Sequence, residues 1–102
     1  MRIIKVPTLR GYARRHPAAR GPLERWIQVV RAADWSSLDD TRATFAHADE
    51  VKVHSGHTVT VFNVAGNRFR LIVSIKYRWG VVYVRDFLTH ADYSRDTWKT
   101  RH

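Results

Sequence analysis

Three runs in the second half of the sequence constrain the fold more than any other feature. They span residues 57–64, 67–77 and 80–88, and each is rich in Val, Ile, Phe and Tyr. The short stretches Ala-Gly-Asn and Arg-Trp-Gly separate them. β-branched and aromatic residues favour strands, and such turn residues join neighbouring strands directly. The sequence therefore predicts a three-stranded antiparallel meander.

The first half predicts a short strand followed by helices. Residues 1–6 alternate weakly before Pro7, as a short strand would, and Thr8 can cap a basic helix that stops at Pro17. A second helix begins at Pro17 or at Pro22, since proline suits the first helical turn. Its apolar stripe, which should lie on the sheet, consists of Leu23, Trp26, Ile27 and Val30.

Two residue pairs have the spacing of a helix capping box. Ser37 and Asp40 predict a third short helix over residues 39–45. Thr89 and Asp92 predict a final helical turn in the tail. Because the helices precede the sheet, the sequence predicts an α+β fold, with residues 1–102 forming a single domain.

Strand periodicity sorts the side chains of the meander into two faces. The set that should face the helices is Phe69, Leu71, Val73, Ile75, Tyr77, Val82 and Val84. The set predicted for the outer face is Arg68, Arg70, Ile72, Ser74, Lys76, Val81, Tyr83, Arg85 and Phe87. Alternating cations and rings suit RNA, because cations hold phosphates and rings stack on unpaired bases. An ordinary solvated face of an antiparallel sheet is the alternative.

The charge balance also favours a polyanionic partner. Eighteen Lys and Arg residues stand against nine acidic residues, which gives a net charge of +9 and a pI near 10.9. An arginine-favouring codon bias would explain 14 Arg against 4 Lys, but not the excess of positive charge. Nucleic acid is the favoured partner, and an acidic protein would also fit.

Several absences exclude other classes. The chain has no cysteine, so disulfides, iron–sulfur clusters and thiol catalysis are excluded, and a reducing compartment is expected. No apolar run has the length of a membrane span or a signal peptide. The sequence therefore predicts a cytoplasmic protein with no membrane partner.

One of the six histidines is a candidate for chemistry. His90 follows the last predicted strand, five residues after Arg85 and three before Tyr93. Imidazole exchanges protons near neutral pH, guanidinium stabilises a phosphorane, and a phenol stacks on a base or donates a proton. These groups can cleave RNA through its own 2′-hydroxyl without a metal. A capping or packing role for His90 is the alternative.

The other histidines receive no role. His54 and His57 have H-x-x-H spacing, but no Cys or nearby carboxylate completes a metal set. Neither a metal nor another cofactor is therefore expected. His47 falls in a connecting segment, His16 at a helix junction and His102 in the tail.

Two longer motifs carry a family resemblance. They are V-F-N-x-x-G-N-x-x-R at residues 61–70 and Y-x-R-x-x-x-T-H-x-x-Y at residues 83–93. Together with residues 16–26 and 33–35, they resemble the HigB family of type II toxins, within the RelE-like superfamily of mRNA-cleaving toxins. The likeness spans about residues 2–93 and implies a RelE-like fold.

The resemblance also implies an activity and partners. Proteins of this kind are ribosome-associated, metal-independent endoribonucleases that cut mRNA in the ribosomal A site. A neighbouring gene encodes a HigA-like helix-turn-helix antitoxin, which holds the toxin inactive, and operator DNA is bound only through the complex. A gyrase-directed toxin of the ParE branch or a non-catalytic binding module is the alternative, and an RNA-binding protein without lethal activity is a third possibility.

The resemblance also implies roles for residues of the two motifs. Gly66 and the capping Thr89 belong to the motifs but receive no chemical role. We assign proton transfer to His90, the scissile phosphate to Arg70 and Arg85, and base stacking or proton donation to Tyr93. Asn67 is expected to occupy the turn at positive φ. Ser94 stands where family members often carry Asp, with Asp96 two residues further on. The predicted RNA contacts are Asn63, Arg68, Lys76, Tyr83 and Lys99.

Overall fold

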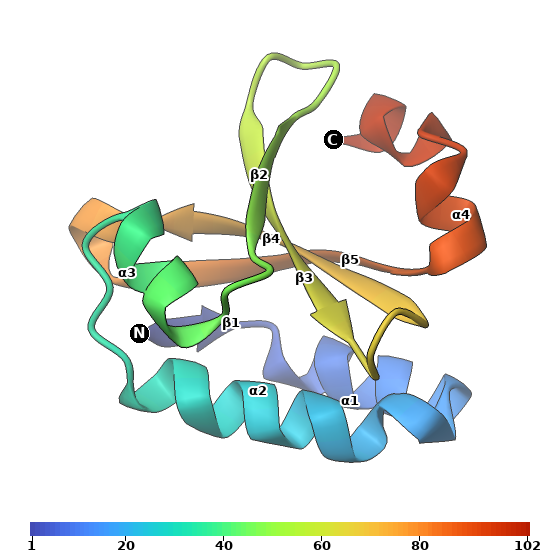
Figure 1. Ribbon diagram of the computed structural model, residues 1–102, viewed down its shortest axis with the longest axis horizontal. Coiled ribbons are helices and arrows are strands. Elements are labelled where there is room, and N and C mark those ends of the chain that lie inside the picture. Colours follow the sequence, from blue (N-terminus) through green and yellow to red (C-terminus); the bar gives the residue numbers. More distant parts are fainter.

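The computed structural model, which describes residues 1–102, places one five-stranded sheet between a helical layer and the C-terminal segment (Figure 1). The strand order is β1-β5-β4-β3-β2; β1 is parallel to β5, and the other neighbours are antiparallel. The strands are β1 (Arg2–Ile4), β2 (Asp49–Lys52), β3 (Thr58–Val64), β4 (Phe69–Lys76) and β5 (Val81–Thr89). The helices are α1 (Val6–Arg15), α2 (Arg20–Ala32), α3 (Leu38–Thr44) and α4 (His90–Ser94), with 3-10 turns η1 (Pro17–Ala19), η2 (Tyr77–Trp79) and η3 (Thr97–Arg101). No helix combines the length and apolarity needed to cross a membrane.

The α+β class and the central meander β3-β4-β5 are confirmed, but strand β2 was not predicted. Its sequence, Asp-Glu-Val-Lys, contains a single apolar residue. The strand pairs antiparallel with β3 at the edge of the sheet. Charged side chains are usual on edge strands, because they discourage pairing with other chains. The same property removes the apolar alternation by which a strand is found in a sequence.

Helix α1 begins earlier than the sequence suggested. Lys5 turns the chain at φ 76°, and Pro7 lies in the first helical turn, where its missing N–H is not needed. Thr8 is therefore not the cap; its N–H donates to the carbonyl of Lys5. Helix α2 follows the η1 turn, so Pro17 starts the turn and Pro22 lies within the first turn of α2. The predicted apolar stripe of α2 is confirmed, since all four side chains are buried.

Both predicted capping residues are confirmed. The N–H of Asp40 donates to Oγ of Ser37 at 3.3 Å, which starts α3. The N–H of Asp92 donates to Oγ1 of Thr89 at 3.2 Å, which starts α4 directly after β5. The second cap fixes the place where the chain leaves the sheet.

A β-bulge in β5 reverses the face to which each later side chain of this strand points. Ile72 pairs with Asp86 while its neighbour Val73 pairs with Val84, so Arg85 is an extra residue in β5. Beyond the bulge, Phe87 turns into the main core instead of lying beside the arginines. The prediction that Phe87 belongs to the outer face is therefore wrong, because strict alternation does not hold across a bulge.

The outer face holds a second, smaller core. The main core of 17 buried residues lies between the helices and the sheet. On the other face, Trp98 of η3 is only 1% exposed and packs on apolar residues of the loop and strands, namely Val53, Val59, Val61, Ile72 and Leu88. The C-terminal segment thus covers much of the face that was predicted to be open and cationic. Truncating a buried tryptophan costs about 3–5 kcal/mol, so this second core contributes substantially to stability.

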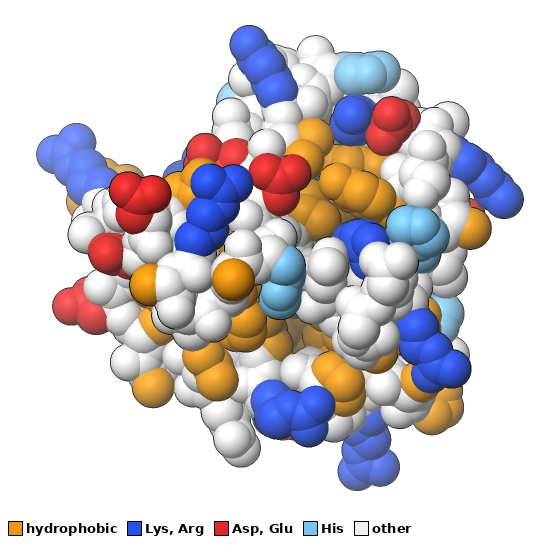
Figure 2. Space-filling view, in the orientation of Figure 1, with side chains coloured by type: hydrophobic (Ala, Val, Ile, Leu, Met, Phe, Trp, Pro, Cys, Tyr) orange, Lys and Arg blue, Asp and Glu red, His pale blue; other side chains and the backbone are white.

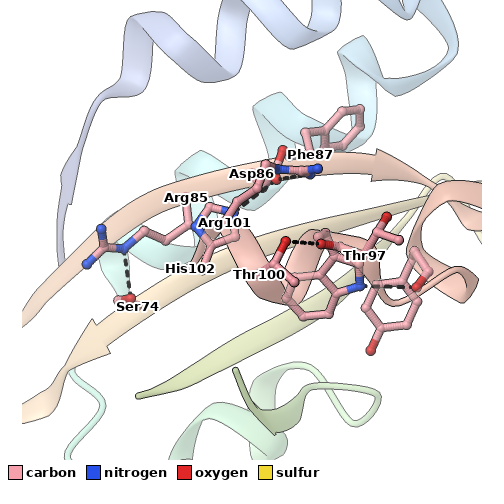
Figure 3. A network of polar contacts seen from close by, with 10 residues as sticks. Ser74, Arg85, Asp86, Phe87, Thr97, Thr100, Arg101 and His102 are labelled. Atoms are coloured by element: carbon pink, nitrogen blue, oxygen red, sulfur yellow. Dashed lines mark hydrogen bonds and ion pairs between the residues drawn. The ribbon is translucent and has the colours of Figure 1, made fainter. Parts of the chain in front are cut away.

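Asp86 ties the bulge to the C-terminus (Figure 3). Its Oδ1 accepts the N–H of Phe87 at 2.9 Å, and its Oδ2 accepts from Arg101 at 2.8 Å and faces Nε2 of His102 at 3.0 Å. Burial alone would raise the pKa of Asp86, but the hydrogen bonds from these three groups lower it below its usual value. The ionised carboxylate is therefore the form that the fold stabilises.

We expect Asp86→Asn to destabilise the protein and to make its free energy of unfolding depend less on pH in the acidic range. A pKa that is depressed in the folded state contributes stability above about pH 4, and this stability is lost as the pH falls through the folded pKa. The variant should lose about 1 kcal/mol at pH 7, where one charge-assisted acceptor becomes neutral. Urea unfolding between pH 3 and 7 measures both effects. Parallel pH profiles for the variant and the parent would contradict this account.

Candidate active site at the end of strand β5

The backbone at the end of β5 places His90 on the surface beside the β3–β4 turn. The N–H of His90 donates to the carbonyl of Arg68 at 2.9 Å, and its carbonyl accepts from Oγ of Ser94 at 2.9 Å. With the Thr89 cap, these bonds fix the first turn of α4 from both sides. The imidazole itself is exposed, so a ligand can reach it.

A buried arginine holds the ring of His90. Arg70 is 8% exposed, and its Nη1 donates to the carbonyls of Asn67 and Phe69 at 3.2 and 3.1 Å. Its Nη2 donates to Oδ1 of Asn67 and contacts Nδ1 of His90 at 3.1 Å. Four of the five N–H groups of a guanidinium are thereby engaged. The structure thus brings together Arg70 and His90, two residues that the sequence analysis assigned to the site, and Arg70 is held by the protein.

The contact with Arg70 selects one tautomer of His90. A guanidinium only donates hydrogen bonds, so Nδ1 of His90 must be the acceptor. The ring proton then lies on Nε2, which is the nitrogen left for a ligand. In this arrangement the imidazole presents an N–H donor outward.

Tyr93 completes this cluster. Its ring lies 5.6 Å from the guanidinium carbon of Arg70 and stacks on Trp98 at 5.3 Å between ring centroids. Burial, together with the charges of Asp49 and Asp96, raises the pKa of Tyr93, and Arg70 offsets this only in part. The phenol is therefore protonated at neutral pH and can donate a hydrogen bond.

His47 is a functional candidate that the sequence did not reveal. It precedes β2, and its ring packs on Phe45 and Phe62 at 5.9 and 6.3 Å between centroids. Burial first, and then the positive charge of Arg70, lowers the pKa of His47 below 6.5. The ring is thus neutral at physiological pH and can accept a proton. Identifying β2 in the sequence would have placed His47 beside the β3 strand end; the missing apolar alternation in β2 hid it.

A hollow lies on the outer side of the sheet. In Figure 2, hydrophobic side chains form the floor of a depression between β2 and the C-terminal segment, and histidine, Lys/Arg and acidic side chains lie along its rim. Val51 and Tyr93 are partly buried against the second core. The hollow therefore offers an apolar surface beside charged and imidazole groups.

Arg85 lies elsewhere on the outer face. Its Nε donates to Oγ of Ser74 at 2.9 Å (Figure 3). Ser74 is four residues from Arg70 along β4, which is about 13 Å in an extended strand. With Lys76, His57 and Arg101, Arg85 lines an open polar pocket of about 460 Å³. The structure does not bring Arg85 to His90.

The other predicted RNA contacts divide between the two regions. Asn63 is exposed and is the cross-strand neighbour of Arg70, and exposed Arg68 contacts His90 through its backbone. Tyr83, 38% exposed, pairs with Ser74 at the Arg85 end. Lys99 pairs with Asp96 and lies over the ring of Trp98.

The β3–β4 turn differs from the prediction. Positive φ occurs at Ala65 (54°) and Gly66 (67°), and Asn67 does not adopt it. The side chain of Asn67 instead accepts from Arg70, so this residue orients the site through a hydrogen bond.

Asp96 adopts φ 62° and pairs with Lys99. No group of three or more His, Cys, Asp or Glu side chains is spaced to hold a metal ion.

Comparison with known proteins agrees with this fold and motif arrangement. A family model described as HigB toxin, the RelE-like toxic component of a toxin-antitoxin system, matches residues 19–96. The mRNA interferase toxin HigB of Escherichia coli K12 is 25% identical over 93 residues, which cover 91% of this chain and 88% of that protein. The mRNA interferase HigB of Escherichia coli O6:H1 is 27% identical over 97 residues, which cover 95% and 92%.

The fold and the matched residues thus define a RelE-like toxic component of a toxin-antitoxin system. Within that class, the chain belongs to the HigB toxin family.

We expect Arg70→Lys to disturb the tautomer of His90 while leaving the charge unchanged. Lysine cannot reproduce the planar fork that reaches Asn67 and His90 together. Long-range ¹H–¹⁵N NMR spectra of the imidazole should report the Nε2–H form in the parent and a mixture in the variant. Arg85→Lys is the matched control and should leave the His90 signals unchanged. An Nδ1–H ring in the parent would contradict the arrangement.

Proposed function

We propose that this toxin is an endoribonuclease that cleaves mRNA through the 2′-hydroxyl of the substrate, without a metal ion. The observation that carries the proposal is the exposed imidazole of His90 held by buried Arg70, with Tyr93 beside it. The names of the relatives, mRNA interferases, support the same reaction. The gyrase-directed alternative is not favoured.

The reaction needs three groups near one phosphate. A base removes the 2′-hydroxyl proton, the 2′-oxygen attacks phosphorus, and the 5′-oxygen leaves with a proton supplied by an acid. The products are a 2′,3′-cyclic phosphate and a free 5′-hydroxyl. Hydrogen-bond donors that contact the non-bridging oxygens stabilise the charge of the intermediate.

We propose a division of roles that differs in part from the sequence-based assignment. Neutral His47 is suited to accept the 2′-hydroxyl proton. His90 is suited to donate through Nε2 to the phosphate, and it can transfer a proton there only if Arg70 releases Nδ1. Protonated Tyr93 is suited to protonate the leaving oxygen, since a phenol is far more acidic than an alcohol.

The positions of the two arginines support different functions for them. Arg70 has one uncommitted N–H, so it acts chiefly by positioning His90 and by its charge. Arg85 has free terminal nitrogens in the polar pocket and is suited to a phosphate about 13 Å along the strand from the cleavage point. We therefore propose that Arg85 holds a neighbouring nucleotide rather than the scissile phosphate.

We further propose the cellular setting that the family resemblance implies. Cleavage occurs in the cytoplasm on messages in the ribosomal A site and so inhibits translation. The partner is a HigA-like helix-turn-helix antitoxin, and operator DNA is contacted only through the complex. The apolar and cationic hollow is suited to a single-stranded message, whose bases are free to stack.

Induction of the protein should stop growth and produce codon-phased cuts in cellular mRNA, as primer extension would record. His90→Ala should reduce cleavage by about 10²- to 10⁴-fold, the usual contribution of a group in proton transfer or charge stabilisation. Arg85→Ala should have a smaller effect. Cutting by purified toxin on ribosomes should survive chelation of transition-metal ions in a buffer that retains the Mg²⁺ that ribosomes need. Growth arrest with intact messages and DNA damage signals would refute the proposal.

The pH dependence of cleavage should identify the base. Because His47 acts when neutral and its pKa is lowered, the rate should fall only as the pH drops below about 6.5. His47→Gln should reduce the rate and abolish this fall at low pH, the acid limb of the pH–rate profile. His54→Gln is the matched control, because His54 is exposed and does not line the polar pocket of Arg85, and it should retain the limb. Persistence of the acid limb in His47→Gln would assign the base to another residue.

A further inference from the structure

The helical layer, and not the sheet, carries most of the net positive charge. Residues 1–33 contain eight of the 18 Lys and Arg residues but one of the nine acidic residues, Glu24. This third of the chain therefore carries +7 of the net +9, and residues 34–102 carry only +2. In Figure 2, acidic side chains gather mainly on the left, near α3, whereas Lys and Arg side chains are spread over the whole face, and those at the lower edge lie over α1 and α2.

A groove between α1 and α2 concentrates this charge. Its volume is about 520 Å³, and three of its six lining residues are arginines: Arg10, Arg14 and Arg20. Glu24 also lines the groove, and its Oε1 pairs with Nε of Arg10 at 3.3 Å. Arg14 and Arg20 are exposed and take part in no ion pair. Two guanidinium groups are thus available to an anionic partner.

The groove is separate from the candidate active site. Helices α1 and α2 cover one face of the sheet, whereas α4 and the C-terminal segment lie on the other (Figure 1). No hydrogen bond, ion pair or cation–π contact joins the residues that line the groove to His90, Arg70 or Tyr93. A partner in the groove would therefore leave the hollow free.

We infer that the α1–α2 groove binds the phosphate backbone of double-helical RNA. The inference rests on the proposed function for the choice of RNA over other polyanions. Arginine favours phosphate, because its planar fork donates two parallel hydrogen bonds. The groove anchors structured RNA while the opposite face holds the message, so that two weak contacts reinforce each other.

The lining of the groove distinguishes duplex RNA from other partners. Protein interfaces are centred on buried apolar or aromatic anchors, but the apolar lining here is limited to Ala13 and Pro17. Single-stranded RNA is held by exposed rings, and the nearby ring of Tyr12 is stacked on Phe87 at 5.2 Å. An A-form helix is recognised by its shape and through its phosphates and 2′-hydroxyls, and exposed guanidinium groups can supply the phosphate contacts.

The test compares two double variants that lose the same charge. Arg14→Gln with Arg20→Gln removes the free cations of the groove, and Lys52→Gln with Arg78→Gln removes two exposed, unpaired cations elsewhere. Both are made in a His90→Ala background, so that cleavage does not interfere. Fluorescence anisotropy measures the affinity of each protein for a labelled 20-base-pair RNA duplex between about 50 and 300 mM KCl. Thermal unfolding followed by circular dichroism confirms that each variant is folded.

The groove variant should weaken duplex binding by at least about tenfold at 100 mM KCl. The slope of log Kd against log salt should fall by about two units, since each phosphate contact contributes about 0.9. The control pair should change the affinity by less than about threefold. Equal losses in both pairs would overturn the inference, because net charge alone would then explain binding.

Two further outcomes also decide the question. If the groove variant keeps its duplex affinity but no longer binds the antitoxin, the groove takes an acidic protein and the inference is wrong. If the parent fails to cut mRNA yet its inactive variant binds duplex RNA with the expected salt slope, the proposed function fails and the groove assignment stands.

Discussion

The extra residue in β5 is the constraint on which the two faces of the sheet depend. Without it, Phe87 would face the outer side and Leu88 would enter the main core, because side chains alternate along a strand. With it, Phe87 stacks on Phe69 and Tyr12 in the main core, and Leu88 faces Trp98. The strand then ends with Thr89 opposite Phe69, which delivers His90 to the β3–β4 turn.

Asp86 couples this bulge to the C-terminal segment. A bulge disturbs the ladder locally, and the carboxylate accepts the N–H of Phe87 at that point. The same carboxylate holds Arg101 and His102, which brings η3 back over the sheet so that Trp98 can fill the second core. Trp98 in turn stacks on Tyr93 and donates to its carbonyl. The local distortion thus reaches the site through packed side chains.

Arg70 is a buried cation whose contacts are all neutral. Its partners are two backbone carbonyls, the amide of Asn67 and the ring of His90, with no carboxylate among them. A buried charge without a counter-ion is unfavourable, and hydrogen bonds offset only part of that penalty. Arg70 therefore makes the local potential positive, which adds to the effect of burial in lowering the pKa of His47. A phosphate that enters the hollow would supply the missing negative charge.

Local signals predicted the parts of the fold that local interactions determine. The capping pairs at Ser37 and Thr89 and the stripe of α2 follow from spacing alone, and the β4 alternation correctly placed Leu71 and Val73 in the core. The bulge was not predictable, since its signal is a change of pairing partner rather than of composition. Arg70 and His90 are 20 positions apart in the sequence. Periodicity could place both on one surface, but it could not predict the hydrogen bond between them.

The division of charge makes the two surfaces of the protein electrostatically independent. The molecule measures 31 × 31 × 23 Å, and the Debye length at physiological salt is about 8 Å. Exposed charges on α1 and α2 that lie more than a Debye length from the hollow are therefore largely screened there, whereas Arg70 acts at direct contact on His90. Outside residues 1–33 the chain is nearly neutral, so a few buried charges set the potential there. Removing helical arginines should consequently alter long-range attraction to polyanions without shifting the protonation of the site.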